Sequence, residues 1–218
     1  MIALNGLAAT YLLERRERYP VTAAAIAESE RLIELARRLA PNDATALLSW
    51  SDLQLSNGRA DLALPASEKA SRLVPSYAIS HVYIAQALLM LGRAGEVQAH
   101  SERAALLAAR DPPKLSAAYL VAAEAALMRG DDERAHELAR RAAAARPANA
   151  AAHATLAALD ALAGRSGQAA AELTTFLALW PDATVARYDE LRPSTHPVYV
   201  AQRERLYEGL RKAGLRER

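Results

Sequence analysis

Few residues in this chain have the types and spacing that chemistry requires. Five histidines are the first candidates, because an imidazole can bind a metal or transfer protons. His81 and His153 fall at equivalent places in two Ala/Leu-rich stretches, and His100 and His136 lie in two other predicted helices. None forms the His-Glu-x-x-His arrangement of zinc hydrolases. We therefore interpret the histidines as packing or surface residues.

Carboxylates and glycines also lack the patterns of active sites. Asp131, Asp132 and Glu133 directly follow Gly130 and open a predicted helix, where negative charge is stabilised and can cap free N–H groups. The chain has no Gly-x-x-x-x-Gly-Lys loop, no Gly-x-Ser-x-Gly elbow and no Gly-x-Gly-x-x-Gly fingerprint. It also has no cysteine, which excludes thiolate metal sites. The sequence therefore predicts no catalytic residue, no metal site and no cofactor.

Composition and charge point to an all-α protein without a nucleic-acid partner. The apolar residues are mostly Ala and Leu, which head the helix propensity scale. Lys and Arg number 27 against 25 Asp and Glu, so no basic field would hold phosphates. Charged residues begin at Glu14, too early for a signal peptide or a membrane span. We expect a cytoplasmic protein with no membrane partner.

The elements that position these residues repeat along the chain. Gly58, Gly92, Gly130 and Gly164 each close one Ala/Leu-rich stretch and precede another, at intervals of 34, 38 and 34 residues. A glycine just past a helix end supplies the positive φ of a C-terminal cap. Proline follows helical runs at a similar period, at Pro41, Pro75, Pro112, Pro147 and Pro181. A period near 34 built from two helices is typical of the tetratricopeptide unit.

Counting each unit so that its glycine is the fifteenth residue places small side chains at shared positions. Units then begin near Ala44, Ala78, Ser116 and Ala150. The eighth, twentieth and twenty-seventh positions, where helices approach closely, are small in all but two cases: Ser51, Ala85, Ala123 and Ala157; Ala63, Val97, Ala135 and Ala169; Ala70, Ala104, Ala142 and Phe176. This pattern resembles the tetratricopeptide repeat family over residues 44–181. Asp160, at a usual Tyr position, and Pro65, early in a second helix, depart from it.

Both ends of the array are expected to differ from the inner units, because an end face meets solvent. We predict a right-handed solenoid of about five helix pairs over residues 1–181, with a degenerate first pair. A short helix over 182–191 and a last helix over 197–213, ended by Gly214, should follow. Tyr199, Leu206 and Leu210 share one face of that last helix and should cover the exposed edge of the last unit. Its arginines and lysine mark a solvated side, at Arg203, Arg205, Arg211 and Lys212. The domain bounds are units at about 2–41, 44–75, 78–112, 116–147 and 150–181, then capping helices over 182–218.

A closer resemblance concerns the tail. Leu191-Arg192-Pro193, His196-Pro197-Val198-Tyr199 and the run from Gln202 to Leu215 are similar to the C-terminal end of bacterial signalling proteins. These are chiefly class III adenylate/guanylate cyclases, and some winged-helix regulators, that end in tetratricopeptide arrays. The spacer Asp111-Pro112-Pro113 also looks like those arrays. The resemblance implies the regulatory region of a larger protein or a free-standing relative, and it carries no cyclase residue with it.

Function is then expected from shape. The family resemblance implies that the first helix of each unit lines a concave groove that binds a protein or peptide, such as another domain of the parent protein. An adaptor or enzyme-associated subunit is the alternative, an enzyme is a third, and self-association stays open. Lys, Arg and Asn, which grip chaperone carboxylates in some family members, are absent from the groove positions. The predicted partner-binding residues are mostly apolar, with three polar points: Leu48, Asp52, Leu55, Val82, Gln86, Leu89, Met90, Leu120, Glu124, Leu127 and Met128. Some of them could instead be core between repeats.

Overall fold

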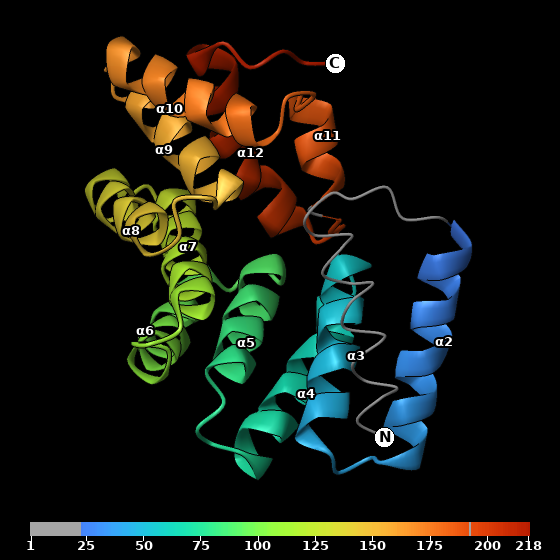
Figure 1. Ribbon diagram of the computed structural model, residues 1–218. Helices are drawn as coiled ribbons and strands as arrows, with labels where there is room; N and C mark the ends of the chain where they lie inside the picture. Colours follow the sequence, from blue (N-terminus) through green and yellow to red (C-terminus); the bar gives the residue numbers. More distant parts are fainter. Residues whose placement is uncertain (1–22, 192) are drawn as a thin grey trace.

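The computed structural model describes residues 23–191 and 193–218, and within these ranges the regular structure is entirely helical (Figure 1). The elements are α2 (Ala23–Leu39), α3 (Ala44–Ser56), α4 (Ala60–Leu73), α5 (Ala78–Met90), the short 3-10 helix η1 (Ala94–Glu96), α6 (Val97–Leu107), α7 (Pro112–Met128), α8 (Asp132–Ala145), α9 (Ala150–Leu162), α10 (Ser166–Leu179), α11 (Val185–Glu190) and α12 (Pro197–Ala213).

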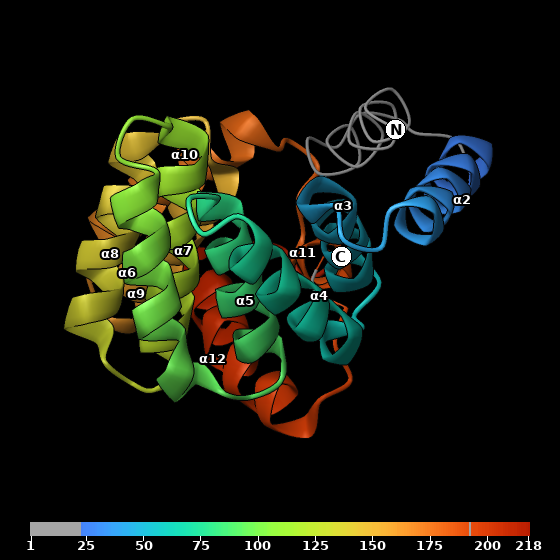
Figure 2. The same cartoon turned by 90° about the horizontal axis from the view of Figure 1, so that it is seen from below.

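Consecutive helices pair and stack into a solenoid. The pairs are α3/α4, α5/α6, α7/α8 and α9/α10, and the second helix of each of the first three packs on the first helix of the next. The first helices α3, α5, α7 and α9 therefore form a row, and α6 and α8 lie along its outer side (Figure 2). We call the opposite side of this row, which α12 contacts, the inner face. The all-α fold predicted from the sequence is confirmed.

The four repeated glycines end the first helices, as predicted. Their φ angles are 75°, 72°, 80° and 74° for Gly58, Gly92, Gly130 and Gly164. At the first of these turns, Gly58 N–H donates to Leu55 O at 3.1 Å and Arg59 N–H donates to Gln54 O at 2.8 Å. This pairing satisfies carbonyls that the helix end would otherwise leave free. The repeat period thus follows from a backbone conformation that only glycine adopts without strain.

The small residues of the predicted register lie where helices cross. The three sets assigned to the eighth, twentieth and twenty-seventh positions are at most 2% exposed in every unit. Phe176 is the large exception, and it is fully buried among Trp180, Tyr188 and the residues around them. This burial agrees with the alignment of the four units, because a misaligned register would have placed some of these positions in solvent.

Two irregular sites in the sequence have local explanations. Pro112 does not follow a helix like the other repeated prolines but is the first residue of α7, which begins one turn before the unit start assigned to Ser116. Proline suits this place because the first helical N–H has no intrahelical partner. The Asp111 side chain caps the helix by accepting from Lys114 N–H at 3.2 Å. Pro65 does not interrupt α4, which runs unbroken from Ala60 to Leu73.

At both ends of the array, the described helices can be compared with the predicted ones. The first helix of the predicted first pair lies outside the described residues, and α2 corresponds to the second, with Ile33 fully buried. The last helix has the predicted bounds and ends at Gly214, whose φ is 101°. Tyr199, Leu206 and Leu210 are all at most 2% exposed, which confirms the apolar face of α12. No helix among the described residues has the length and apolar character needed to cross a membrane.

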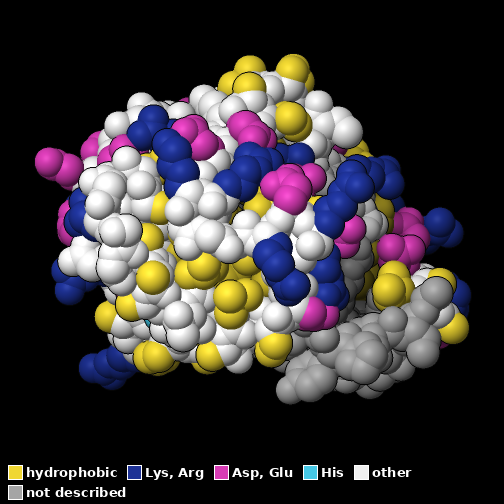
Figure 3. All heavy atoms as spheres, turned by 90° about the horizontal axis from the view of Figure 1, so that it is seen from above, with side chains coloured by type: hydrophobic (Ala, Val, Ile, Leu, Met, Phe, Trp, Pro, Cys, Tyr) yellow, Lys and Arg dark blue, Asp and Glu magenta, His cyan; other side chains and the backbone are white. Residues whose placement is uncertain are grey.

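Charged side chains of both signs share the surface. On the face shown in Figure 3, Lys and Arg side chains lie beside Asp and Glu side chains, with apolar atoms between them. Elsewhere along the chain, charges also pair within one helix, as Arg31 does with Glu28 at 2.7 Å and Lys212 with Glu208 at 2.7 Å. Such mixing gives no single-sign field on that face, in agreement with the small net charge.

Candidate functional site

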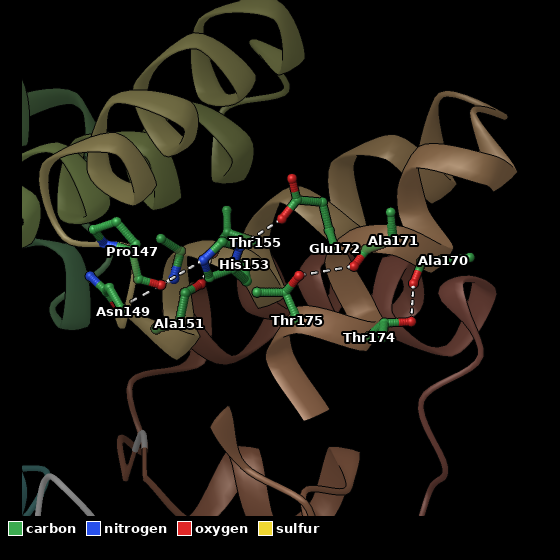
Figure 4. A network of polar contacts seen from close by, with 11 residues as sticks. Pro147, Asn149, Ala151, His153, Thr155, Ala170, Ala171, Glu172, Thr174 and Thr175 are labelled. Atoms are coloured by element: carbon green, nitrogen blue, oxygen red, sulfur yellow. Dashed lines mark hydrogen bonds and ion pairs between the residues drawn. The ribbon is translucent and has the colours of Figure 1, made fainter. Parts of the chain in front are cut away.

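Four of the histidines join neighbouring helices in polar contacts. His81 and His100 approach through their Nδ1 atoms at 3.2 Å, linking α5 to α6. His153 lies between Glu172 Oε2, at 2.7 Å, and Pro147 O, at 2.9 Å, so it ties α9 to α10 and to the preceding turn (Figure 4). Among the described residues, no group of three or more His, Cys, Asp or Glu side chains could hold a metal ion. The geometry fits packing roles for these histidines.

The His81–His100 pair predicts a pH dependence. Burial lowers the pKa of both rings below 6.5; His100 and Arg103 lower that of His81 further, while Glu68 and Glu96 oppose the change at His100. The unfolded chain therefore binds protons more readily than the folded chain. The neutral rings therefore favour the folded state. This stabilisation is complete above about pH 6.5 and is lost as the pH falls through the lowered pKa values of the two rings.

We expect the melting temperature to decrease when the pH is lowered from about 7.5 to about 5.5. The decrease should be smaller in His100→Gln than in the parent. Thr175→Ala, an exposed change on α10, should show the full decrease. Thermal unfolding followed by circular dichroism checks this. Identical decreases in the parent and in His100→Gln would contradict it.

The acidic residues that the sequence singled out are structural contacts. Asp131 caps α8 by accepting from Arg134 N–H at 3.2 Å, as predicted. Asp160 is 3% exposed and binds both His136 Nε2, at 3.0 Å, and Arg165 Nε, at 2.8 Å. The carboxylate that replaces the usual Tyr therefore joins α8, α9 and the turn after α9. Asp132 has a partner that the sequence did not suggest, Arg205 of α12, at 2.5 Å.

The predicted groove residues lie on the first helices, and most are buried in this state. Asp52, Gln86 and Leu120 are partly exposed. The other eight are at most 9% exposed: Leu48, Leu55, Val82, Leu89, Met90, Glu124, Leu127 and Met128. Six of them belong to one apolar cluster, and Leu127 belongs to the next. Their role in binding a partner stays a prediction, and their burial shows that they also serve the core.

The C-terminal helix α12 lies against the inner face. It packs most extensively on α9, and it also contacts α7, α10 and α11. At its crossing with α9, a Cβ added to Gly209 would lie 2.6 Å from Ala158 O and 2.7 Å from Ala158 Cβ. Glycine is unfavourable inside a helix, so its presence here reflects the close approach of the two backbones. Tyr199 belongs to the cluster of Leu89 and Met90, while Leu206 and Leu210 belong to that of Leu127.

The segment before α12 is held at the ends of α3 and α5. A Cβ on Gly58 would lie 2.1 Å from Pro193 O, and one on Gly92 would lie 2.7 Å from Val198 Cβ. Ser194 Oγ donates to Met90 O at 3.1 Å. Residues 193–213 therefore run from the end of α3 past α5 and α7 to α9. Beyond Gly214 the chain reaches α11, where Val185 N–H donates to Arg216 O at 2.9 Å.

Two expectations about α12 can be compared with its contacts. The helix contacts the last unit mainly through α9 and only slightly through α10, and it extends beyond that unit to α7. Arg203 does not lie on a solvated side: it is 9% exposed, pairs with Asp189 Oδ1 at 2.9 Å and lies over the rings of Tyr199 and Tyr207. A guanidinium paired and stacked in this way can be buried at little cost. Arg211 and Lys212 are exposed, as predicted.

Comparisons with known proteins identify the fold. The chain resembles the solved structure of PilW, a widely conserved type IV pilus biogenesis factor, with a TM-score of 0.66 and 20% identity over 95% of this chain and 89% of that one. A thermophilic TPR protein of Thermus thermophilus gives 0.64 and 18%, over 86% and 91%. Pseudomonas aeruginosa PilF gives 0.66 and 16%, over 97% and 93%. The fold is a tetratricopeptide solenoid.

No protein-family model matches the solenoid, and no curated protein matches it. Identities of 20% or less relate these structures by architecture alone. None of the three is described as part of a cyclase, so the resemblance of the tail to cyclase C-termini receives no support.

Proposed function

We propose that this solenoid is a non-catalytic protein-interaction or scaffolding module that binds a helical segment of a partner on its inner face. The observation that carries the proposal is α12 itself: the inner face already packs a helix against α9 with almost no space between the backbones. A face that accepts one amphipathic helix has the shape and apolar character for another, which is how helix-in-groove recognition works.

The chemistry of the face supports the proposal. Ala154 and Ala158 of α9 are buried and small, and Leu127 and Leu159 lie in the cluster that receives Leu206 and Leu210. Polar side chains at the edge, such as Asp132, would fix the direction and register of a bound helix, since charges at a rim contribute more to specificity than to affinity. Gln86 and Asp52, both partly exposed, would extend this edge toward α3.

Two settings fit this function. The module could be a free-standing cytoplasmic adaptor, or it could regulate an attached signalling domain such as a nucleotide cyclase, and a cyclase or winged-helix coding sequence adjoining this one would favour the second. Both settings use the same face for the partner. The proposal therefore concerns the face and does not depend on the parent protein.

Site-specific photo-crosslinking in the native cell tests the proposal. A crosslinking residue at Gln86 should capture a partner through one amphipathic helix, identified by mass spectrometry of the crosslinked peptide. The control position is Arg140, exposed on the second helix α8. Capture from Arg140 alone, or crosslinks to partner segments without helical apolar periodicity, would place recognition elsewhere.

A further inference from the structure

We propose that α12 is a built-in occupant of the inner face and that the partner is an amphipathic helix of the same chemistry, which must displace it. The proposal rests on the function proposed above and adds the identity of the ligand and the way access to it is controlled. Three features of α12 define that ligand: a small residue at the crossing with α9, apolar residues seven and four positions apart, and an arginine that meets Asp132.

The helix α12 is placed like a bound ligand and unlike a further repeat. Each first helix of the array packs on the second helix of the preceding unit, but α12 has only slight contacts with α10. It contacts the first helices α9 and α7 instead, and it takes part in both large apolar clusters. Residues 193–196, directly before α12, have no helical structure; they begin with Pro193 and precede Pro197. A helix preceded by such a segment can leave the face without unfolding a repeat.

Hydrogen bonding between α12 and the inner face is incomplete. Among the described residues, six buried side-chain atoms lack a hydrogen-bond partner, and four belong to α12 or to groups it meets: Asp132 Oδ1, His196 Nδ1, Gln202 Oε1 and Arg205 Nε. The other two, Gln54 Oε1 and Ser67 Oγ, lie in α3 and α4. Most buried polar atoms are paired, so the concentration of unpaired atoms around α12 distinguishes its contact with the inner face. Arg205 and Asp132 form an ion pair at 2.5 Å through their other atoms. The pair therefore fixes the position of α12 along the inner face, while Asp132 Oδ1 and Arg205 Nε remain without a hydrogen-bond partner.

The apolar contact between α12 and the inner face is strong enough to compete with a partner helix. The apolar anchors of α12 are fully buried, so a competing helix needs equivalent side chains to replace them. A tethered helix also acts at a high effective concentration, and a free ligand must exceed it. A partner that only matched α12 would bind weakly to the parent chain. A change that loosens α12 should therefore raise the apparent affinity of that partner, because the open state becomes populated.

The test uses the full chain and a fluorescent peptide of residues 193–218 as the probe helix. Gly209→Leu should release α12, because even a Cβ would meet the backbone of Ala158. Gly167→Leu on α10 is the matched control, since a Cβ there meets nothing within 4 Å. We expect the peptide to bind Gly209→Leu at least about tenfold more tightly than the parent or the control. Hydrogen exchange across residues 197–213 should rise in Gly209→Leu alone.

The other outcomes overturn the proposal in distinguishable ways. Equal peptide affinity for the parent and for Gly209→Leu would mean that α12 does not limit access, although helix binding on the inner face would stand. No binding to Gly209→Leu despite a released α12 would refute both this proposal and the proposed function. Unchanged protection of α12 would show that the crossing does not hold it. Dimerisation of the parent through exchanged α12 helices would make a second copy the occupant.

A second pair of variants covers the case in which Gly209→Leu does not fold. Gly92→Ala places a Cβ against Val198 and His196 at the start of α12. Gly130→Ala has a φ similar to that of Gly92 but meets nothing within 4 Å. Tighter peptide binding by the first variant than by the second supports the proposal. Equal binding by the two would overturn it.

Discussion

Phe176→Ala is expected to be among the most destabilising single changes in this chain, although it restores the residue type found at the same position of the other units. Ala70, Ala104 and Ala142 occupy that position where a further repeat follows. At the last unit α11 follows instead, and Phe176 fills the wider space, with its ring 6.0 Å from Trp180 and 5.7 Å from Tyr188 between centroids. Removing a fully buried Phe leaves a cavity and costs about 3–5 kcal/mol.

Urea unfolding measures this loss, and Thr175→Ala on the exposed side of α10 is the control. The control should change the free energy of unfolding by less than about 0.5 kcal/mol, as surface substitutions usually do. Equal midpoints for the two variants would mean that the aromatic cluster contributes no packing energy and that α11 is not part of the core.

Gly58→Ala is expected to cost more than Gly164→Ala, although the two glycines have nearly the same backbone conformation. Their φ angles are 75° and 74°, so the strain of placing a side chain there, about 1 kcal/mol, is common to both. Only at Gly58 does the added Cβ meet other atoms, with Pro193 O at 2.1 Å. Relieving that overlap should add about 1–3 kcal/mol, the usual cost of overpacking.

Thermal unfolding of the two variants gives the difference directly. Hydrogen exchange around Ser194 should also increase in Gly58→Ala, because the overlap pushes the segment away from α3. If the two variants melt together and exchange alike, residues 193–196 do not pack on the end of α3 in solution.

The fold could be predicted from the sequence because each repeat carries its own local signals. A glycine with positive φ at Gly58 or Gly164 depends on a turn of a few residues, and a buried alanine such as Ala142 depends on the neighbouring helix. Both constraints recur at a fixed period, so one unit supports the assignment of the next. The bounds of α12 were predicted for the same reason, from Pro197 and Gly214.

The position of α12 could not be predicted in this way. Its apolar face shows that Tyr199, Leu206 and Leu210 are buried, but apolar periodicity does not say against which surface. Two signals were present in the sequence: Gly209 within the last helix, and the small residues Ala154 and Ala158 within the first helix of the last unit. Small residues on both sides of a crossing allow backbones to approach closely, but nothing in the sequence pairs Gly209 with Ala158, because the two lie 51 residues apart.

The way α12 joins both apolar clusters also bears on how the array yields to stress. In a solenoid each unit touches only its neighbours, so terminal units can fray while the rest stay folded. Tyr199 at one end of α12 and Leu210 at the other attach it to α3–α7 and to α7–α11, so those units share one clasp. When α12 is bound, unfolding of one unit should destabilise the other units that α12 contacts, so melting should be cooperative. When α12 is released, each unit should instead unfold separately, and melting should be less cooperative.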